Sequence, residues 1–331
     1  MMEVKYLVDS EYEAWDKFVD ISPQGFIFDY SWWVNILTNG DFKICALFDD
    51  DNIIVAGLVL PFFSKRHIHN PILTQSMGIL YEDMSKRNNM RLQKQLTKQK
   101  EYAIALWDFF IKDIDRLSLQ FNYHFEYWSP LYWKGCEQTT KYTFVIDYDN
   151  YVPEEEFKRF SKGHKWILNR VQKKSDLKVV ETEDVNEYLR ESLKTYERQE
   201  TKRAYSDDVV KALYLELKRQ NMVKIFKCID SEGRIHGIAI FIFDHREVYY
   251  WLGASDAVLR ESGGHTYMVW YAIQYFADKV GTFNFGGSMM EAVEKNFRNF
   301  SSFPKSYYLI SYDKRPVLAQ AKKLIRLLIG K

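Results

Sequence analysis

Residues 247–279 read EVYYWLGASDAVLRESGGHTYMVWYAIQYFADK. An apolar run rich in aromatic residues leads into a polar loop with two adjacent glycines, and a second apolar run follows. The first run predicts a buried strand over 247–255, and the second predicts a helix from about Gly264 to Lys279. The glycines stand where the chain must turn from strand into helix.

The same order of elements continues on both sides of this segment. The remaining predictions for the second half are strand 177–182 (LKVVET), helices from Asp184 to about Gln199 and from Asp207 to Gln220, strands 223–229 and 234–243, strand 282–287 (TFNFGG), a helix from Met289 to about Phe300, and strand 306–311. This half therefore reads strand, two helices, three strands, helix, strand, helix, strand.

The first half repeats the order although it does not repeat the sequence. Its predicted elements are strand 3–8, helices 11–20 and 30–37, strands 42–48 and 52–63, a long helix from about Asn88 to Leu117, and strands 123–128 (YHFEYW) and 141–148. We predict an α/β protein with mixed sheets, made of a first lobe over 1–150, a basic linker helix over 151–175, a second lobe over 176–312 and a basic C-terminal helix over 313–331.

Composition limits the function classes. Lys+Arg total 46 and Asp+Glu total 45, so the net charge of +1 provides no overall field to attract DNA or a membrane. The three cysteines are far apart, and the N-terminus lacks the pattern of a signal peptide. No apolar run approaches the ~18 residues of a membrane span. We expect a soluble, cytoplasmic protein.

Several short segments carry a family resemblance. They are 22–25 (SPQG), 31–33 (SWW), 56–61 (AGLVLP), 132–135 (YWKG), 140–143 (TKYT), the basic helix with Lys165, Ile167 and Arg170, 196–199 (YERQ), 250–255 (YWLGAS), 283–288 (FNFGGS) and 297–300 (FRNF). In this order they resemble the FemABX-like members of the GNAT superfamily of acyltransferases. The resemblance spans about residues 14–312.

The resemblance implies two similar GNAT lobes packed side by side, with the working cleft largely in the second lobe. It also implies transfer of an acyl or aminoacyl group to an amine. The best-known members of the family add amino acids from aminoacyl-tRNA to the peptidoglycan stem peptide. This chain lacks the helical arm that some of these enzymes insert in the second lobe, although tRNA-dependent members without the arm exist.

The donor site is predicted at the loop before the helix that begins at Gly264. GNAT donor loops carry Arg or Gln, two residues, Gly, one residue, then Gly or Ala. Here Arg260, Gly263 and Gly264 fit, but His265 replaces the small final residue. Backbone N–H groups at a helix start bind phosphate, and His265 would either crowd the pyrophosphate or bind it. The alternative is that the glycines only turn the chain.

The strand before this loop is predicted to lie where GNAT enzymes separate two strands. Backbone N–H groups of Leu252, Gly253 and Ala254 would then polarise the acyl carbonyl. The alternative is a core strand with a bulge at its glycine.

The general base is less defined. Asp256, just after this strand, and Glu247, near its start, are the carboxylates predicted to face the cleft, with Asp244 and Glu291 less favoured. Water or the substrate is the alternative base. His265 is the histidine tied to a motif, and it is a further catalytic candidate. No metal site is predicted.

Further residues are predicted to line the cleft or to contact substrate. Residues 157–174 contain seven basic residues and no acid, which suits a phosphorylated ligand. The alternative is a solvated helix neutralised by the acidic residues 154–156. The predicted set comprises Lys165, Arg170, Arg198, Gln199, Trp251 and Arg298 for substrate, and Gly287 and Ser288 beside the donor.

These observations predict an N-acyltransferase that acts on a cell-envelope or surface-polysaccharide precursor, nucleotide-linked or lipid-linked. Acetyl-CoA or another acyl-CoA is the favoured donor, and aminoacyl-tRNA, with tRNA as partner, is the alternative. A GNAT-derived protein that binds a nucleotide sugar without catalysis is a third possibility. The basic tail 313–331 would either dock on the protein or bring it to the cytoplasmic face of the membrane.

Overall fold

Two strands, β7 (Glu137–Asp147) and β13 (Phe303–Asp313), carry the chain between the two units into which the structure divides. The computed structural model describes residues 2–64, 66–86, 90–198, 200–287 and 289–315. One unit contains the described residues up to Lys141 and from Ser306 onward, and the other is Tyr142–Lys305. Each of the two strands therefore begins in one unit and ends in the other.

The first unit is built on a mixed sheet in the order β1-β2-β3-β4-β6-β13. Neighbouring strands are antiparallel except for the parallel pair β4–β6, and short β5 pairs with β3. The strands are β1 (Glu3–Tyr6), β2 (Phe42–Phe48), β3 (Ile54–Ser64), β4 (His67–His69), β5 (Leu80–Tyr81) and β6 (Arg116–Gln120).

Helices pack on this sheet through aromatic residues. The helices are α1 (Tyr12–Ile21), α2 (Ser31–Thr38), α3 (Leu92–Phe110) and α4 (Ser129–Tyr132). Trp15 of α1 is fully buried against β3, where a Cβ at Gly57 would lie 2.6 Å from its ring. Tyr102, Leu106 and Phe110 of α3 join the core with strand residues such as Leu58 and Leu119.

Two predictions fail in this unit. The long helix predicted to reach Leu117 ends at Phe110, and Arg116–Gln120 is strand β6 because β4 and β13 both pair with it. The strand predicted over 123–128 is irregular. Asn122 accepts a hydrogen bond from the His124 N–H at 2.9 Å, which satisfies the backbone locally and turns the chain.

The second unit has a mixed sheet in the order β7-β12-β11-β10-β9-β8. Its strands, besides β7, are β8 (Lys178–Thr182), β9 (Val223–Ile229), β10 (Ile235–Phe243), β11 (Glu247–Ala254) and β12 (Thr282–Asn284). β11 and β12 are parallel, and the other neighbours are antiparallel. These strands confirm the predicted order of elements.

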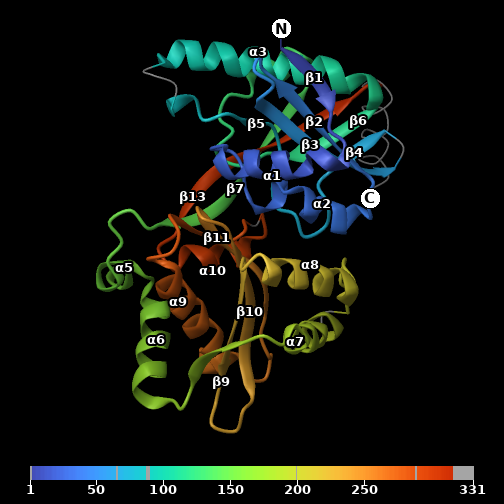
Figure 1. Cartoon of the computed structure of the whole chain (residues 1–331). Coiled ribbons are helices and arrows are strands. Elements are labelled where there is room, and N and C mark those ends of the chain that lie inside the picture. The colour runs from blue at the N-terminus through green and yellow to red at the C-terminus, as the bar shows by residue number, and fades with distance from the viewer. Residues whose placement is uncertain (1, 65, 87–89, 199, 288, 316–331) are drawn as a thin grey trace, which may run out of the picture. The chain divides into compact units, whose positions relative to one another are not determined.

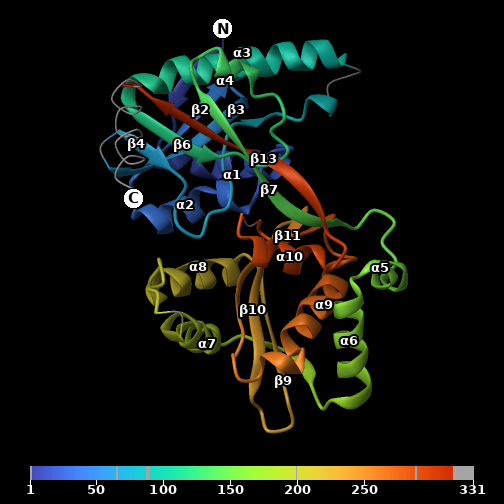
Figure 2. The same cartoon turned by 180° about the vertical axis from the view of Figure 1, so that it is seen from behind.

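Helices cover both faces of this sheet. They are α5 (Pro153–Arg159), α6 (Lys162–Lys174), α7 (Val185–Arg198), α8 (Asp207–Arg219), α9 (Gly264–Phe276) and α10 (Glu291–Arg298). Figures 1 and 2 show α6 and α9 on one side of β9 and β10, with α7 and α8 on the other. The core under α9 is rich in aromatic residues, including Phe226, Phe241, Phe276 and Phe283.

The predicted linker 151–175 is part of the second unit. It forms two helices, α5 and α6, separated at Ser161, whose hydroxyl accepts the His164 N–H as the N-cap of α6. Phe160, between them, packs edge-on against Trp270 of α9 with ring centroids 4.8 Å apart. The boundaries predicted at residues 150 and 176 thus fall inside this unit, because both helices belong to its core.

Candidate functional site

Two parallel strands of the second unit part from each other. β11 and β12 pair over Glu247–Tyr249, and Tyr249 opposite Asn284 is their last pair. β11 continues to Ala254, paired with β10 alone. In the described part of the chain no strand pairs with the other edge of β11 beyond Tyr249, and we call this edge, over Tyr250–Ala254, the open edge of β11.

Asn284 marks the point of separation. Its side-chain N–H donates to Oε1 of Glu247 at 2.9 Å, and its Oδ1 accepts from the Thr143 hydroxyl at 2.5 Å and from the Gly286 N–H at 2.8 Å. These bonds join three neighbouring strands and turn the chain away from β11. The buried amide therefore fixes where β12 stops.

The open edge carries the residues predicted to hold the acyl carbonyl. Ile240 is opposite Leu252 but Phe241 is opposite Tyr250, so Trp251 is an extra residue in β11. This is a β-bulge, a device that re-aims a strand. A Cβ at Gly253 would lie 1.7 Å from the Tyr250 hydroxyl, so only glycine fits there.

The loop after β11 is also shaped by glycines. Arg260–Ser262 forms one 3₁₀ turn, and Gly263 follows at φ = 85°. A Cβ at Gly263 would lie 2.4 Å from Ile167 Cγ2, and one at Gly264 would lie 2.5 Å from the His236 Cβ. The start of α9 is therefore pressed closely against both α6 and β10.

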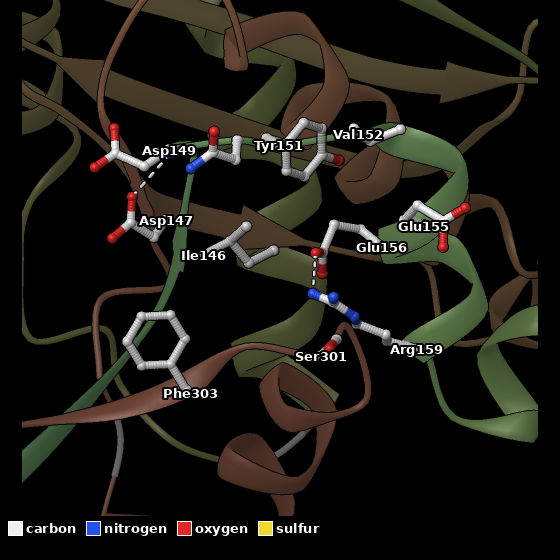
Figure 3. A pocket seen from close by; sticks show the side chains of 11 residues that line it. Ile146, Asp147, Asp149, Tyr151, Val152, Glu155, Glu156, Arg159, Ser301 and Phe303 are labelled. Carbon is white, nitrogen blue, oxygen red and sulfur yellow. Dashed lines mark hydrogen bonds and ion pairs between the residues drawn. The ribbon is translucent and has the colours of Figure 1, made fainter.

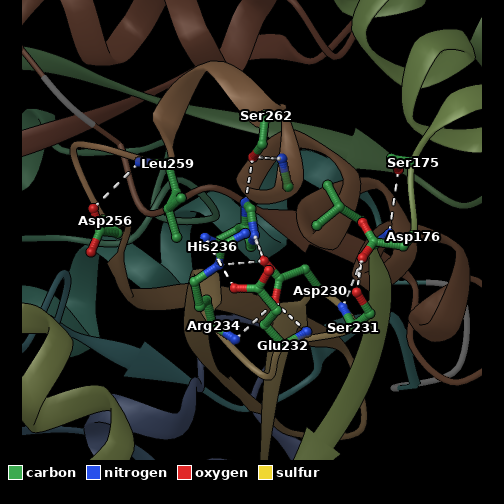
Figure 4. A network of polar contacts seen from close by, with 12 residues as sticks. Ser175, Asp176, Asp230, Ser231, Glu232, Arg234, His236, Asp256, Leu259 and Ser262 are labelled. Carbon is green, nitrogen blue, oxygen red and sulfur yellow. Dashed lines mark hydrogen bonds and ion pairs between the residues drawn. The ribbon is translucent and has the colours of Figure 1, made fainter.

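A chain of polar contacts, with His236 and Asp230 buried at its centre, supports this loop, as Figure 4 shows. Nδ1 of His236 lies 2.8 Å from the Ser262 hydroxyl oxygen, which also accepts the Gly264 N–H at 3.1 Å. Nε2 of His236 lies 3.1 Å from Asp230 Oδ2, and Arg234 donates to the same oxygen at 2.7 Å. Burial acts to raise the pKa of Asp230, but these hydrogen bonds outweigh it and hold the pKa well below its ordinary value.

Arg170 of α6 holds the loop from the other side. Its Nη2 donates to the backbone carbonyls of Glu261 and Ser262, the latter at 2.8 Å. A guanidinium on two consecutive carbonyls orients this peptide and adds positive charge beside it. Arg170, predicted to contact substrate, thus acts on the loop itself.

The start of α9 has the properties of an anion site. The first amides of a helix lack intrahelical acceptors, and the helix dipole is positive there. Gly264 donates to Ser262, while the structure gives the N–H groups of His265 and Thr266 no acceptor among the described residues. Arg260, exposed beside them, adds a cation.

His265 points from α9 to the sheet. Its Nε2 lies 2.9 Å from the Tyr250 hydroxyl, and its Cα is the atom that a Cβ at Gly237 of β10 would meet at 2.9 Å. Burial, with Arg260 and His164 nearby, lowers the pKa of His265 to about 4, and burial raises the pKa of Tyr250. Near neutral pH the pair is uncharged, and the imidazole is occupied by Tyr250.

Comparisons with known proteins give one family-model match and several similar solved structures. Residues 162–294 match the family model described as the acetyltransferase (GNAT) domain. No curated protein sequence matches the chain. The structure titled FemX aligns with a TM-score of 0.68 at 14% identity, over 96% of this chain and 99% of its own.

The chain has the FemABX-like tandem GNAT fold. L-PGS from Bacillus licheniformis aligns with a TM-score of 0.56 at 14% identity, over 99% of this chain and 98% of its own. A tandem GNAT protein from the clavulanic acid biosynthesis pathway aligns with a TM-score of 0.52 at 9% identity, over 95% and 99%. The residues that match the acetyltransferase (GNAT) domain model all lie in the second unit.

The carboxylates predicted as general bases have structural partners. Asp256 Oδ1 accepts the N–H of Val258 at 2.7 Å and that of Leu259 at 3.4 Å, which shapes the loop before Arg260. Glu247 is buried at the opposite end of β11 from Gly253, about 20 Å away at ~3.3 Å per residue. This distance argues against Glu247 as the base at the open edge.

The other predicted contacts are dispersed. Lys165 Nζ donates to the Lys158 carbonyl at 2.9 Å, and Arg298 of α10 pairs with Glu294 at 3.1 Å. Gly287 follows β12 at φ = 64°. Gln199, Ser288, the side chain of Arg198 and the tail from residue 316 lie outside the part of the chain that the structure describes.

The sequence did not single out Tyr250, His236, Asp230 or Ser262. Tyr250 and Ser262 stand inside quoted segments, but nothing in the sequence distinguishes them from neighbouring strand and loop residues. Asp230 and His236 flank the turn 231–233, and an acid and a histidine on the two sides of a hairpin are the one signal that was available.

A pocket of about 410 Å³ lies elsewhere in the second unit, between the end of β7 and α5. Figure 3 shows its carboxylate-rich wall, with Asp147, Asp149, Glu155 and Glu156 and the ion pair from Glu156 to Arg159 at 2.5 Å. None of the predicted site residues lines it. Among the described residues no His, Cys, Asp or Glu side chains cluster as a metal site requires, and none of the helices is long and apolar enough to cross a membrane.

Proposed function

We propose that this protein transfers an acyl group from acyl-CoA to an amine on a cell-envelope or surface-polysaccharide precursor. One observation carries the proposal: an open edge of β11 lies directly before a glycine-built helix start. GNAT chemistry needs both features, the edge for the acyl carbonyl and the helix start for the donor pyrophosphate.

The chain's own residues have defined roles in this reaction. The amides of His265 and Thr266, with Arg260, bind the pyrophosphate. Backbone N–H groups near Gly253 polarise the carbonyl, and the amine nitrogen attacks it directly. The Tyr250 hydroxyl, which stays protonated before the reaction because burial raises its pKa, donates its proton to the sulfur as the C–S bond breaks. The proton that the attacking nitrogen loses as the amide forms then passes to the Tyr250 oxygen and restores the phenol.

The attacking amine must first lose a proton. Asp256 is the carboxylate that follows the open edge, and its Oδ1 is engaged by backbone N–H groups. Its other oxygen, or water, accepts the proton. No covalent enzyme intermediate forms.

Aminoacyl-tRNA is the second candidate donor. Arg170 of the basic helix α6 binds the loop Arg260–Gly264, which we call the donor loop. The structure is also similar to that of FemX. The same carbonyl site would then hold the aminoacyl ester, and the leaving group would be a ribose hydroxyl.

A transfer assay tests the proposal. Release of free coenzyme A from acetyl-CoA is measured with a panel of amino sugars, nucleotide-linked amino sugars and lysine-containing muropeptides. Amine-dependent release that Gly264→Val abolishes supports the acyl-CoA reaction. Transfer from aminoacyl-tRNA alone supports the second donor, and binding of a nucleotide sugar without turnover supports a protein that has lost catalysis.

A further inference from the structure

Trp166 of α6 is an exposed aromatic residue in a basic helix. Its side chain is 61% exposed, although α6 buries Leu168 and Val171 on its other face. The guanidinium carbon of Arg170 lies 4.7 Å from the centre of the indole ring. One face of the ring is therefore held by a cation, while most of the residue is open to solvent.

Arg170 ties this ring to the donor loop. The guanidinium that stacks on Trp166 also binds the carbonyls of Glu261 and Ser262. Ser262 in turn accepts the N–H of Gly264 at the start of α9. Two residues, Arg170 and Ser262, thus connect the indole to the amides that would bind the donor pyrophosphate.

The charge around the ring favours an anionic ligand. Lys162 and Lys173 of α6 are exposed, and no acid occurs between residues 157 and 174. A flat aromatic surface with flanking cations is the arrangement that binds nucleobases of phosphorylated ligands through stacking.

We propose that Trp166 and Arg170 form a stacking platform for the adenine ring of the donor. This inference rests on the proposed function, because it takes the start of α9 as the pyrophosphate site. Both candidate donors carry this group: coenzyme A has an adenosine beyond its pyrophosphate, and aminoacyl-tRNA ends in an adenosine. The platform selects adenine in either case, and it explains an exposed tryptophan beside the loop.

The test compares donors with and without adenine. The dissociation constants of acetyl-CoA and of S-acetyl-pantetheine, which lacks the adenosine, are measured for the wild type, Trp166→Ala and Trp166→Phe. We expect Trp166→Ala to raise the dissociation constant of acetyl-CoA by about 5- to 150-fold, the range for loss of one base–aromatic stack. Trp166→Phe keeps most of the affinity, and S-acetyl-pantetheine binds all three proteins equally.

Trp133→Ala is the matched control. Trp133 is 56% exposed and has the Lys100 ammonium 5.4 Å from its ring, but it lies in the first unit. This variant leaves acetyl-CoA binding unchanged. An acetyl-CoA affinity within twofold of wild type in Trp166→Ala overturns the platform, and so does an equal loss for both ligands.

A second arm distinguishes the two sources of adenine. If wild type does not bind acetyl-CoA, the titration uses an aminoacylated RNA minihelix ending in CCA and the same RNA without its terminal adenosine. A wild-type preference for the terminal adenosine that Trp166→Ala abolishes supports the platform with the RNA donor, and an unchanged preference overturns it. If wild type binds neither donor, both the proposed function and the platform are overturned. If wild type binds a donor and Trp166→Ala binds it equally well, the platform alone is overturned.

Discussion

The Tyr250 hydroxyl lies 2.9 Å from Nε2 of His265, and the same hydroxyl would be 1.7 Å from a Cβ at Gly253. His265, the first residue of α9 that faces the sheet, therefore orients the phenol of Tyr250 beside the open edge of β11. This relationship places a proton donor at the predicted carbonyl site and explains both the histidine and the glycine.

Tyr250→Phe tests the phenol. The variant keeps the ring in the core but removes the hydroxyl, so we expect the turnover number to fall about 10²-fold or more, the usual effect of losing a general acid. The dissociation constant of acetyl-CoA should stay within about threefold of wild type. Equal turnover in the two proteins would assign the hydroxyl a purely structural role.

Gly264→Ala tests the close approach of α9 to β10. The added Cβ would collide with His236, so we expect a loss of about 1–3 kcal/mol in the free energy of unfolding and at least tenfold weaker acetyl-CoA binding. Gly163→Ala is the control, because its Cβ would meet no atom nearer than Ser161 Oγ at 4.0 Å. Denaturant melts and calorimetric titration measure both quantities, and two variants that behave alike would contradict the packing argument.

Ser262→Ala tests the polar chain behind the loop. The variant removes the contact with His236 and the acceptor of the Gly264 N–H, so acetyl-CoA should bind about 2- to 12-fold more weakly, as for one lost hydrogen bond. Ser231→Ala, whose hydroxyl contacts Asp176 outside the loop, should bind normally. An unchanged affinity in Ser262→Ala would show that Arg170 alone holds the loop.

Stability should depend on pH through two histidines. Burial lowers the pKa of His164 and of His265 to about 4, while an unfolded histidine titrates near 6.5. Between these values the unfolded chain binds more protons, so stability falls as pH drops from 6.5 towards 4, by about 1–3 kcal/mol per histidine. Urea melts of wild type and His164→Phe should diverge over this range, with the shallower dependence in the variant, and parallel curves would exclude His164 as a cause.

The second unit was largely predictable because its signals are local. The strand 223–229 and the helix that begins at Asp207 were predicted within one residue, since apolar periodicity defines them. In the structure Ser206 caps this helix. The glycines of residues 260–264 led to the prediction of a donor loop there, and the structure shows that a Cβ at Gly263 or Gly264 would collide with a neighbouring element.

The failures concern long-range pairing. Residues 116–120 could equally end an apolar helix or form a strand. They form β6 because they pair with β4 and β13, which are distant in sequence. For the same reason the sequence could not show that β7 and β13 each pass from one unit to the other. The contacts of His236 and His265 depend on how these elements pack, so they could not be predicted from the sequence either.

Donor binding at the start of α9 is tested most directly by a thermal melt with acetyl-CoA. At about 100 times its dissociation constant the ligand should stabilise the native protein by about 2.7 kcal/mol. We predict a clear rise in the melting temperature of wild type and of Gly163→Ala, and a much smaller rise for Gly264→Ala. An unchanged melting temperature of wild type at millimolar acetyl-CoA would contradict the acyl-CoA donor site.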